Sequence, residues 1–287
     1  MKVIRITRKS RGYPERLGVL HKPPERLSSL GEDINRLLEE PVLGIVGSRK
    51  VTAYGRAVTE ELAEAAVRAG ICIASGLALG VDSIAHMSAL RAGGKTIAVL
   101  PSGLKSIYPA SHRKLARDIV IKGGTLVSEY EDDFHPRKES FIQRNRIIAG
   151  LSDALLVTEA AERSGSLYTA DFALEAGIPV LAVPGNIKSP SSMGTNNLLK
   201  SGAIMASNEQ DIFDALKITP ERPKQLDIYG DSEQESAILK LLSGGISNGD
   251  ELHKKSGLDI ETFQRTLSML EIKGYIHPLG NNHWRTK

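Results

Sequence analysis

Residues 137–146 concentrate side chains that could contact a nucleic acid. These ten residues include four cations, the amide of Asn145 and one aromatic ring; the cations are Arg137, Lys138, Arg144 and Arg146, and the ring is Phe141. Cations can hold phosphates, and a ring beside them can stack on a base, which together meet the requirements of a single-stranded nucleic acid site. We predict such a site here. Arg144 and Arg146 do not suit the middle of a core helix, and we expect the apolar residues 147–150 that follow this segment to form a turn.

Turns rich in glycine and serine supply a second set of candidates, at residues 47–49, 75–76 and 164–166. Glycine lets a backbone approach a ligand, and a helix N-terminus presents free N–H groups to an anion. Arg49 adds a cation that can hold a phosphate in bidentate fashion. A single turn of this kind is usually only a tight connection, but at 164–166 two hydroxyls flank a glycine where a helix is predicted to begin. The candidate phosphate-binding residues are Gly47, Ser48, Ser75, Gly76, Ser164, Gly165 and Ser166.

The residue types do not assemble a catalytic or metal site. The turn after Gly47 lacks the G-x-G-x-x-G dinucleotide motif, and the chain lacks G-x-x-x-x-G-K-[ST]. His86 follows Asp82 by four residues, and a helical histidine held by a local carboxylate is more often structural than an acid–base pair. Seven scattered histidines and one cysteine do not match a zinc site. We predict no catalytic residue, metal or cofactor, and expect Glu129 and Glu159 to position basic side chains.

Short apolar runs alternate with amphipathic helical patterns along residues 41–216. The runs lie at 42–46, 71–74, 96–100, 126–127, 154–157, 180–183 and 203–205, and the helical patterns at 57–69, 83–91 and 168–176. Such alternation predicts an α/β fold with a mostly parallel sheet covered on both faces, a doubly wound Rossmann-like domain. Its ligands would bind beyond the carboxyl ends of the strands, where the turns above are expected.

Length and composition indicate an ordinary globular protein. The chain has 287 residues, 41% of them hydrophobic. Its formal net charge of +3 is too small to indicate a polyanionic partner by itself. The single Cys72 excludes an intrachain disulfide and fits a reducing compartment. No segment has the length of a membrane span, and the N-terminus carries charges where a signal peptide is apolar. We expect a soluble cytoplasmic protein without a membrane partner.

The ends of the chain differ from its middle. Residues 1–40 read as a short basic extension, with eight cations against two carboxylates in residues 1–30. Residues 217–232 read as a linker containing Pro220, Pro223 and Gly230. Helical patterns at 233–242, 248–256 and 260–273 and a hairpin at 275–285 predict a winged-helix domain over residues 233–287. Its seven cations and seven carboxylates leave two interpretations open: a protein contact, or DNA binding by a local patch at Lys254 and Lys255.

Taken in order, these turns resemble the DNA-processing protein A family, also called Smf, the recombination mediators of bacterial natural transformation. The matching stretches lie at residues 44–55, 75–86, 96–100, 107–109, 128–130, 141–152, 164–170 and 183–185, and the resemblance spans about residues 41–207. Many members begin with a helical domain of the SAM type. Fewer than fifty residues precede the first predicted strand here, so that domain is expected to be absent.

The resemblance implies a function and assigns residues to it. The family binds single-stranded DNA in a basic pocket of its Rossmann domain, forms homodimers, hands the strand to the RecA recombinase, and is not known as an enzyme. Its pocket arginine falls on Arg49, and its lysine and stacking aromatic fall on Lys138 and Phe141. The Arg-Asn-Arg motif falls on Arg144, Asn145 and Arg146. Two roles stay open for both arginines: contact with DNA, or a clamp on Glu129 or Glu159 that shapes the pocket.

Two other functions compete with this one. Related Rossmann proteins, the lysine decarboxylase-like nucleoside-monophosphate phosphoribohydrolases, carry a Pro-Gly-Gly-x-Gly-Thr-x-x-Glu turn whose glutamate acts on the ribose. The corresponding turn here lacks that glutamate, and Asp171 stands one position late. The other alternative is an interaction scaffold, in which the winged helix docks a partner protein.

Overall fold

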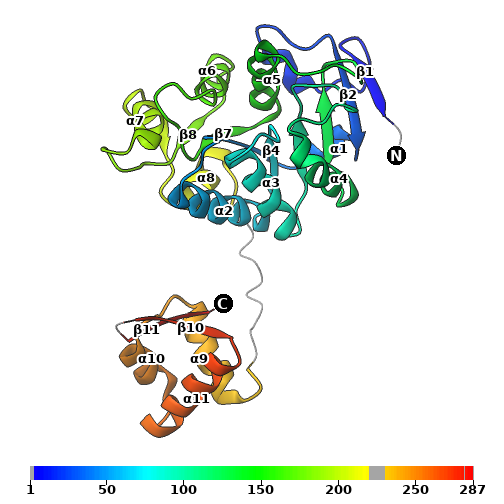
Figure 1. Cartoon of the computed structure of the whole chain (residues 1–287). Coiled ribbons are helices and arrows are strands. Elements are labelled where there is room, and N and C mark those ends of the chain that lie inside the picture. The colour runs from blue at the N-terminus through cyan, green and yellow to red at the C-terminus, as the bar shows by residue number, and fades with distance from the viewer. Residues whose placement is uncertain (1–2, 220–229, 281, 287) are drawn as a thin grey trace. The chain divides into compact units, whose positions relative to one another are not determined.

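The structure, a computed structural model, describes residues 3–219, 230–280 and 282–286. The chain divides into two compact units, Met1–Pro220 and Glu221–Lys287 (Figure 1). Each unit has a hydrophobic core of its own. The predicted linker at 217–232 spans the division, and its residues 220–229 lie outside the described part of the chain.

The first unit is built on a nine-stranded sheet with the order β1-β2-β6-β5-β4-β3-β7-β8-β9 (Figure 1). Strands β3 to β9 pair in parallel, whereas β1 and β2 are antiparallel additions at one edge. The strands are β1 Ile4–Thr7, β2 Arg26–Gly31, β3 Val42–Val46, β4 Cys72–Ser75, β5 Thr96–Val99, β6 Thr125–Ser128, β7 Ala154–Val157, β8 Val180–Ala182 and β9 Ile204–Met205. The predicted α/β class and mostly parallel sheet are therefore confirmed.

Helices cover both faces because every central strand is apolar on both sides. In β3, Val42 and Val46 belong to one core cluster, and Leu43 and Ile45 to another. Helices α2, α3 and α8 pack on the second cluster, and α5 and α6 on the first. Their bounds, with those of the shorter helices, are α1 Ile34–Leu37, α2 Ala53–Arg68, α3 Val81–Arg91, α4 Arg113–Ile121, α5 Lys138–Leu151, α6 Leu167–Glu175, α7 Met193–Lys200 and α8 Glu209–Leu216, with 3-10 turns Glu15–Val19, Ala110–His112 and Pro190–Ser192.

Residues 1–40 contribute more to this unit than a basic extension would. Strand β2 pairs with β6, and β1 pairs with β2, which moves the edge of the sheet beyond the predicted boundary at residue 41. Leu17 and Leu27 are buried in the core. Several cations of this segment are held by carboxylates: Arg5 by Asp132, Arg8 by Glu25, Arg16 by Asp153 and Arg26 by Glu131.

Helix α5 corrects the expected turn at residues 147–150. The helix runs from Lys138 to Leu151 without a break and buries Ile147, Ile148 and Leu151. Arg144 and Arg146 are buried within this helix, although arginines were not expected in the middle of a buried helix. The helix tolerates both because each guanidinium reaches acceptors inside the fold, which offset the cost of removing a charge from water.

The strand order reverses between β3 and β7. The chain moves from β3 outward through β4, β5 and β6, then returns to the other side of β3 with β7, β8 and β9. At such a reversal the connections leave in opposite directions, so a crevice opens beyond the carboxyl ends of the two strands. The turns after Val46 and Val157 line this crevice.

The second unit contains three helices and a hairpin, as predicted. Helices α9 Glu233–Ser243, α10 Gly249–Ser256 and α11 Ile260–Ile272 enclose a core that includes Leu239, Leu252, Phe263 and Leu270. Strands β10 Ile276–Gly280 and β11 His283–Thr286 form the antiparallel hairpin. Asn248, Asp259 and Ser232 cap the three helices through side-chain hydrogen bonds.

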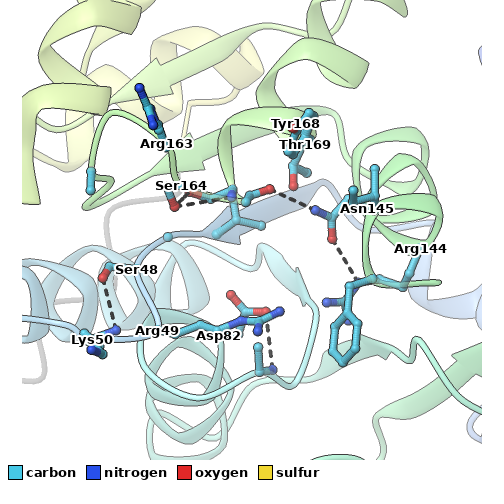
Figure 2. Close-up of a pocket in the computed structure, with 18 of the residues that line it drawn as sticks. Ser48, Arg49, Lys50, Asp82, Arg144, Asn145, Arg163, Ser164, Tyr168 and Thr169 are labelled. Carbon is cyan, nitrogen blue, oxygen red and sulfur yellow. Dashed lines mark hydrogen bonds between the residues drawn. The ribbon is translucent and has the colours of Figure 1, made fainter. Parts of the chain in front are cut away.

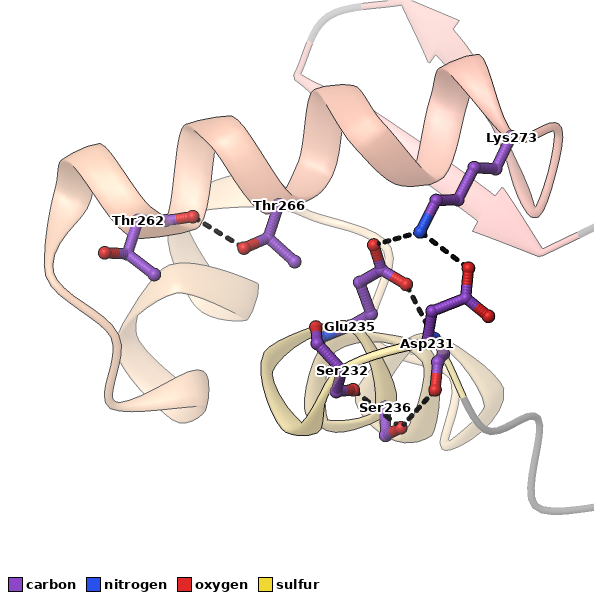
Figure 3. Close-up of polar contacts among 8 residues, drawn as sticks. Asp231, Ser232, Glu235, Ser236, Thr262, Thr266 and Lys273 are labelled. Carbon is purple, nitrogen blue, oxygen red and sulfur yellow. Dashed lines mark hydrogen bonds and ion pairs between the residues drawn. The ribbon is translucent and has the colours of Figure 1, made fainter.

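A polar network ties the start of this unit to the end of α11 (Figure 3). Lys273 Nζ donates to Asp231 at 2.8 Å and to Glu235 at 2.7 Å, and Asp231 N donates to Glu235 at 2.8 Å. These carboxylates raise the pKa of Lys273 to about 12. Elsewhere in the unit Lys255 pairs with Glu251. Lys273 and Lys255 are therefore both paired with carboxylates of this unit, and Lys255 belongs to the predicted DNA-binding patch at Lys254 and Lys255.

None of the helices in the described part of the chain has the length and apolar character needed to cross a membrane.

Candidate nucleic-acid interface

A cleft of about 850 Å³ lies at the reversal of strand order, where turns after β3 and β7 meet the first half of α5 (Figure 2). Ten of the thirteen predicted site residues line it. They are Gly47, Ser48, Arg49, Lys138, Phe141, Arg144, Asn145, Ser164, Gly165 and Ser166. Arg146, Ser75 and Gly76 do not.

Arg49 and Phe141 meet although they are far apart in the sequence. The guanidinium carbon of Arg49 lies 4.9 Å from the centroid of the Phe141 ring, within the range of a cation–π contact. The ring of Tyr108 meets Phe141 edge-to-face, with centroids 5.5 Å apart and an interplanar angle of 77°. A cation that can hold a phosphate thus lies beside two aromatic rings that can contact a base.

Exposed cations line the same cleft as these rings. Arg49, Lys50, Lys138 and Arg163 are all exposed and all line the cleft, whose only lining carboxylate among the described residues is Asp82. Sequence reasoning missed Lys50 and Arg163. Each stands directly beside a predicted turn residue, Arg49 or Ser164, and that adjacency could have identified both. Tyr108 was noticed only as part of a family stretch.

Arg144 lines the cleft although it is only 3% exposed. Its Nη1 donates to the carbonyl oxygens of Gly76 and Val99, the latter at 2.5 Å, and its Nε donates to Asn145 Oδ1 at 3.1 Å. Burial lowers the pKa of Arg144 to about 10, and the nearby Asp82 acts in the opposite direction. A side chain so engaged ties the carboxyl ends of β4 and β5 to α5.

Gly76 is required by Arg144 rather than by a ligand. A Cβ at this position would lie 2.5 Å from the Arg144 guanidinium. Ser75 beside it donates from Oγ to the Ile45 carbonyl oxygen at 2.6 Å and is fully buried. The predicted phosphate-binding turn at 75–76 therefore supports the floor of the cleft and does not open into it.

Asp82 is the negative group at this floor. It is buried, and Figure 2 shows it close to Arg49. Burial raises its pKa, while Arg144 and the Ala78 N–H lower it. Asp82 was expected beside His86 from their spacing, but its neighbours in the structure are these cleft residues.

Arg146 lies outside the cleft and binds a carboxylate. It is 8% exposed, and its Nη2 donates to Glu129 Oε2 within a buried ion pair. Burial raises the pKa of Glu129, and Arg146 opposes that rise. Of the two open roles for this arginine, the geometry matches the clamp on Glu129.

Glu159 differs from the expected role of positioning a cation. Its carboxylate accepts hydrogen bonds from Thr52 N at 3.2 Å and from Thr52 Oγ1. Thr52 is the N-cap of α2. The buried Glu159 thus joins the turn after β7 to the start of α2, where it lies near the positive end of the helix dipole.

The turn at residues 164–166 leads into α6. Ser164 and Ser166 share a hydrogen bond between their hydroxyls at 2.7 Å, and Asn145 Nδ2 donates to the Gly165 carbonyl oxygen at 3.2 Å (Figure 2). Thr169, in the first turn of α6, is 1% exposed, and its Oγ1 has no hydrogen-bond partner among the described residues. Two serine hydroxyls and an unpartnered threonine hydroxyl at the N-terminus of a helix suit an anion.

The glycines of the cleft serve two different purposes. A Cβ on Gly47 would lie 2.7 Å from Val81 and 2.8 Å from the Glu159 carbonyl oxygen, so Gly47 allows the turn to pack. A Cβ on Gly165 would meet nothing within 4 Å. Packing within the chain therefore does not require glycine at 165, and the position is open on the side of the cleft.

His86 is a structural residue. It is fully buried, and its Nδ1 lies 2.7 Å from Thr96 Oγ1, which donates to the Ile73 carbonyl oxygen at 2.7 Å. Because the Thr96 hydroxyl donates its proton to Ile73, Nδ1 of His86 carries the ring proton and donates it to Thr96 Oγ1. Nε2 of His86 then has no hydrogen-bond partner among the described residues. Burial lowers the pKa of His86 to about 3. Its expected carboxylate partner, Asp82, is not the group that holds it.

Among the described residues no three His, Cys, Asp or Glu side chains cluster as a metal site would require. Cys72 is buried in the core, and burial raises the pKa of its thiol to about 12. The thiol is therefore protonated at neutral pH.

The fold and site together define a Rossmann-like protein with a cationic, aromatic cleft and a separate winged-helix domain. Residues 4–217 match the family model of DNA recombination-mediator protein A, and residues 219–282 match the DprA winged helix domain. The chain belongs to this family, which the sequence motifs had indicated.

Relatives and solved structures agree with this assignment. Protein Smf of Escherichia coli is 37% identical over 254 residues, covering 85% of this chain and 68% of its own. DNA processing protein DprA of Bacillus subtilis is 41% identical over 216 residues, covering 75% and 71%. The DprA structure from Streptococcus pneumoniae aligns with a TM-score of 0.70 at 37% identity, covering 75% and 74%. DNA processing protein A from Helicobacter pylori, whose single-stranded DNA binding mode has been described, aligns at 0.67 and 34%, covering 76% and 96%.

We expect His86 to make the protein acid-sensitive. Above pH 6.5 the histidine is neutral in the folded and unfolded states, but below it only the unfolded chain takes up the proton. The free energy of unfolding should therefore fall by about 1.4 kcal/mol per pH unit between roughly pH 5.5 and 4 on account of this residue. Denaturant unfolding at several pH values measures the slope.

The control is His86→Asn, whose amide can still donate to Thr96. Asp82 and Glu129 titrate in both proteins, so their contributions cancel in the difference. The histidine's slope should be missing from the variant, and equal slopes in the two proteins would contradict the assignment.

Proposed function

We propose that this protein binds single-stranded DNA in the cleft without sequence preference and loads a RecA-type recombinase onto the strand. The observation that carries the proposal is the meeting of four exposed cations with the Phe141 ring in one cleft. Phosphates and bases are the two components of single-stranded DNA that such groups recognise, and neither contact reads a base edge.

The roles divide according to exposure. Arg49, Lys50, Lys138 and Arg163 are assigned to phosphates because they are exposed in the cleft. Phe141 is assigned to a base. Arg144 is assigned a positioning role because its guanidinium is already bound to backbone carbonyls. Asn145 joins α5 to the 164–166 turn, and Arg146 supports the region through Glu129.

The turn at 164–166 is assigned to a phosphate of the strand. Its support is the combination of the α6 N-terminus, the unpartnered Thr169 hydroxyl and the open position of Gly165. A phosphate at this turn would lie in the same cleft as Arg163 and Lys138.

An enzymatic alternative has less support. The phosphoribohydrolase mechanism needs a carboxylate near the ribose, but Asp171 is exposed and does not line the cleft. Asp82, which does, is buried close to Arg49 and Arg144. We therefore propose a binding protein without catalytic activity, and release of free base from a nucleoside monophosphate would contradict this.

The proposal includes two partners. We propose a homodimer that delivers its strand to the recombinase in the cytoplasm, as the sequence resemblance implies; the name of the matching family, a recombination mediator, fits delivery of a strand. The winged helix, with Lys273 and Lys255 held by its own carboxylates, is proposed to contact protein rather than DNA.

The first prediction concerns salt. The affinity for an oligothymidylate should fall with salt at a log–log slope of about −0.7 per phosphate neutralised, and Lys138→Ala should reduce the slope's magnitude by about 0.7. Fluorescence anisotropy between 50 and 300 mM salt measures it, with Lys114→Ala, an exposed lysine of α4 outside the cleft, as the matched control. Undiminished binding by Arg49→Ala combined with Lys138→Ala would exclude this cleft as the site.

The second prediction concerns Gly165. Gly165→Ala should not lower the free energy of unfolding, because the new methyl group meets no atom of the chain and alanine restricts the unfolded state. It should still weaken DNA binding by roughly 10- to 150-fold, the equivalent of losing a hydrogen bond to a charged phosphate. Gly18→Ala is the control, since a Cβ at Gly18 is equally free of contacts and lies outside the cleft. Equal affinities for both variants would reject the 164–166 turn as a phosphate site.

The third prediction concerns loading. On an oligonucleotide covered with single-strand-binding protein, the wild-type protein should shorten the lag of recombinase filament assembly, and the Arg49→Ala, Lys138→Ala variant should not. Assembly can be followed by the recombinase's DNA-dependent ATPase activity. An unchanged lag with wild-type protein that does bind the strand would reject the loading role and leave the DNA-binding role standing.

A further inference from the structure

Phe141 offers less free ring surface than its place in the motif suggests. The Arg49 guanidinium lies over the ring at 4.9 Å, and Tyr108 contacts it edge-to-face at 5.5 Å. Phe141 is itself only partly exposed. Tyr108, in contrast, lines the same cleft and is 47% exposed. The most accessible aromatic surface of this contact cluster therefore belongs to Tyr108.

The backbone around Tyr108 is held in place before any ligand arrives. Tyr108 lies in the connection between β5 and the 3-10 turn Ala110–His112. This connection is bonded to the segment after β6: Gly103 N donates to Phe134 O at 2.9 Å, and Lys105 N donates to Asp132 O at 3.0 Å. On the other side His112 N donates to Pro109 O at 2.9 Å. An ordered ring loses little conformational entropy when a base stacks on it.

We propose that Tyr108 is a second base-stacking residue and that, together with Phe141, it selects single-stranded over double-stranded DNA; the inference rests on the proposed function of the cleft. The two ring planes are 77° apart. Bases stacked on both rings would be turned out of parallel by a similar angle. Successive bases in a duplex are parallel and stacked on each other, so a duplex cannot satisfy both rings.

The other exposed tyrosine of the cleft does not offer this geometry. Tyr168 is similarly exposed, but it belongs to the first turn of α6, beside Thr169 and on the wall that carries Arg163 (Figure 2). Tyr168 has no ring contact with Phe141 among those of the described residues. The pair that can turn two neighbouring bases is therefore Tyr108 with Phe141.

The test compares three ligands of equal length: a single-stranded oligothymidylate, a hairpin duplex, and an abasic strand that keeps the phosphates without bases. Tyr108→Ala should weaken binding of the oligothymidylate by about 5- to 150-fold, the effect of one lost base stack, and leave affinity for the duplex and the abasic strand unchanged. Tyr108→Phe should bind like wild type, because the ring face is kept. Tyr54→Ala is the matched control, since Tyr54 is 50% exposed on α2 and does not line the cleft.

A double mutant separates stacking from simple support of Phe141. If Tyr108 stacks on its own base, the losses of Tyr108→Ala and Phe141→Ala should multiply in the double variant. If the double variant binds no worse than Phe141→Ala alone, Tyr108 only supports Phe141 and the inference is wrong. A loss that is equal for all three ligands would also overturn it. Failure of wild-type protein to bind the oligothymidylate would instead reject the proposed function itself.

Discussion

The cleft depends on one buried cation. Arg144 donates to the carbonyl oxygens of Gly76 and Val99, which end neighbouring strands of the sheet, and it originates from the middle of α5. Residues three and four apart lie on the same face of a helix. Once Arg144 is bound to the strand ends, Phe141 therefore lies on the same face one turn earlier, and Lys138, three residues before Phe141, also lines the cleft. Gly76 leaves the space that the guanidinium occupies.

Burial separates the charges of this region into two groups with different consequences. Arg144 and Arg146 are inside the protein; Arg144 donates to backbone carbonyl oxygens, and Arg146 pairs with Glu129 through Nη2. Arg49, Lys50, Lys138 and Arg163 remain exposed around one cleft, where the only carboxylate among the described lining residues is the buried Asp82. A chain with a net charge of only +3 can thus concentrate positive potential at one point on its surface. In the winged-helix domain Lys273 and Lys255 are instead paired with carboxylates of the same domain.

Much of this protein could be predicted from its sequence because the relevant signals are local. The seven parallel strands were found because each is a short apolar run, and the winged helix because its helices and hairpin follow one another directly along the sequence. Strands β1 and β2 were missed because residues 4–7 and 26–31 carry polar side chains and are recognisable as strands only through the pairing of β2 with β6 and of β1 with β2. Helix α5 was missed in part because its buried arginines look unsuitable until their distant acceptors are known.

In the segment at residues 137–146, some properties follow from the sequence and others depend on the tertiary structure. Residue types and spacing alone determined that cations, an amide and a ring would occur together and that a turn rich in serine and glycine would follow at 164–166. They did not determine which arginines are available, because a guanidinium is exposed or buried according to the carbonyl or carboxylate groups that other strands bring near it. Only the fold directs Arg144 inward to Gly76 and Val99, Arg146 to Glu129, and Arg49 across the cleft to Phe141, where Tyr108 meets the same ring.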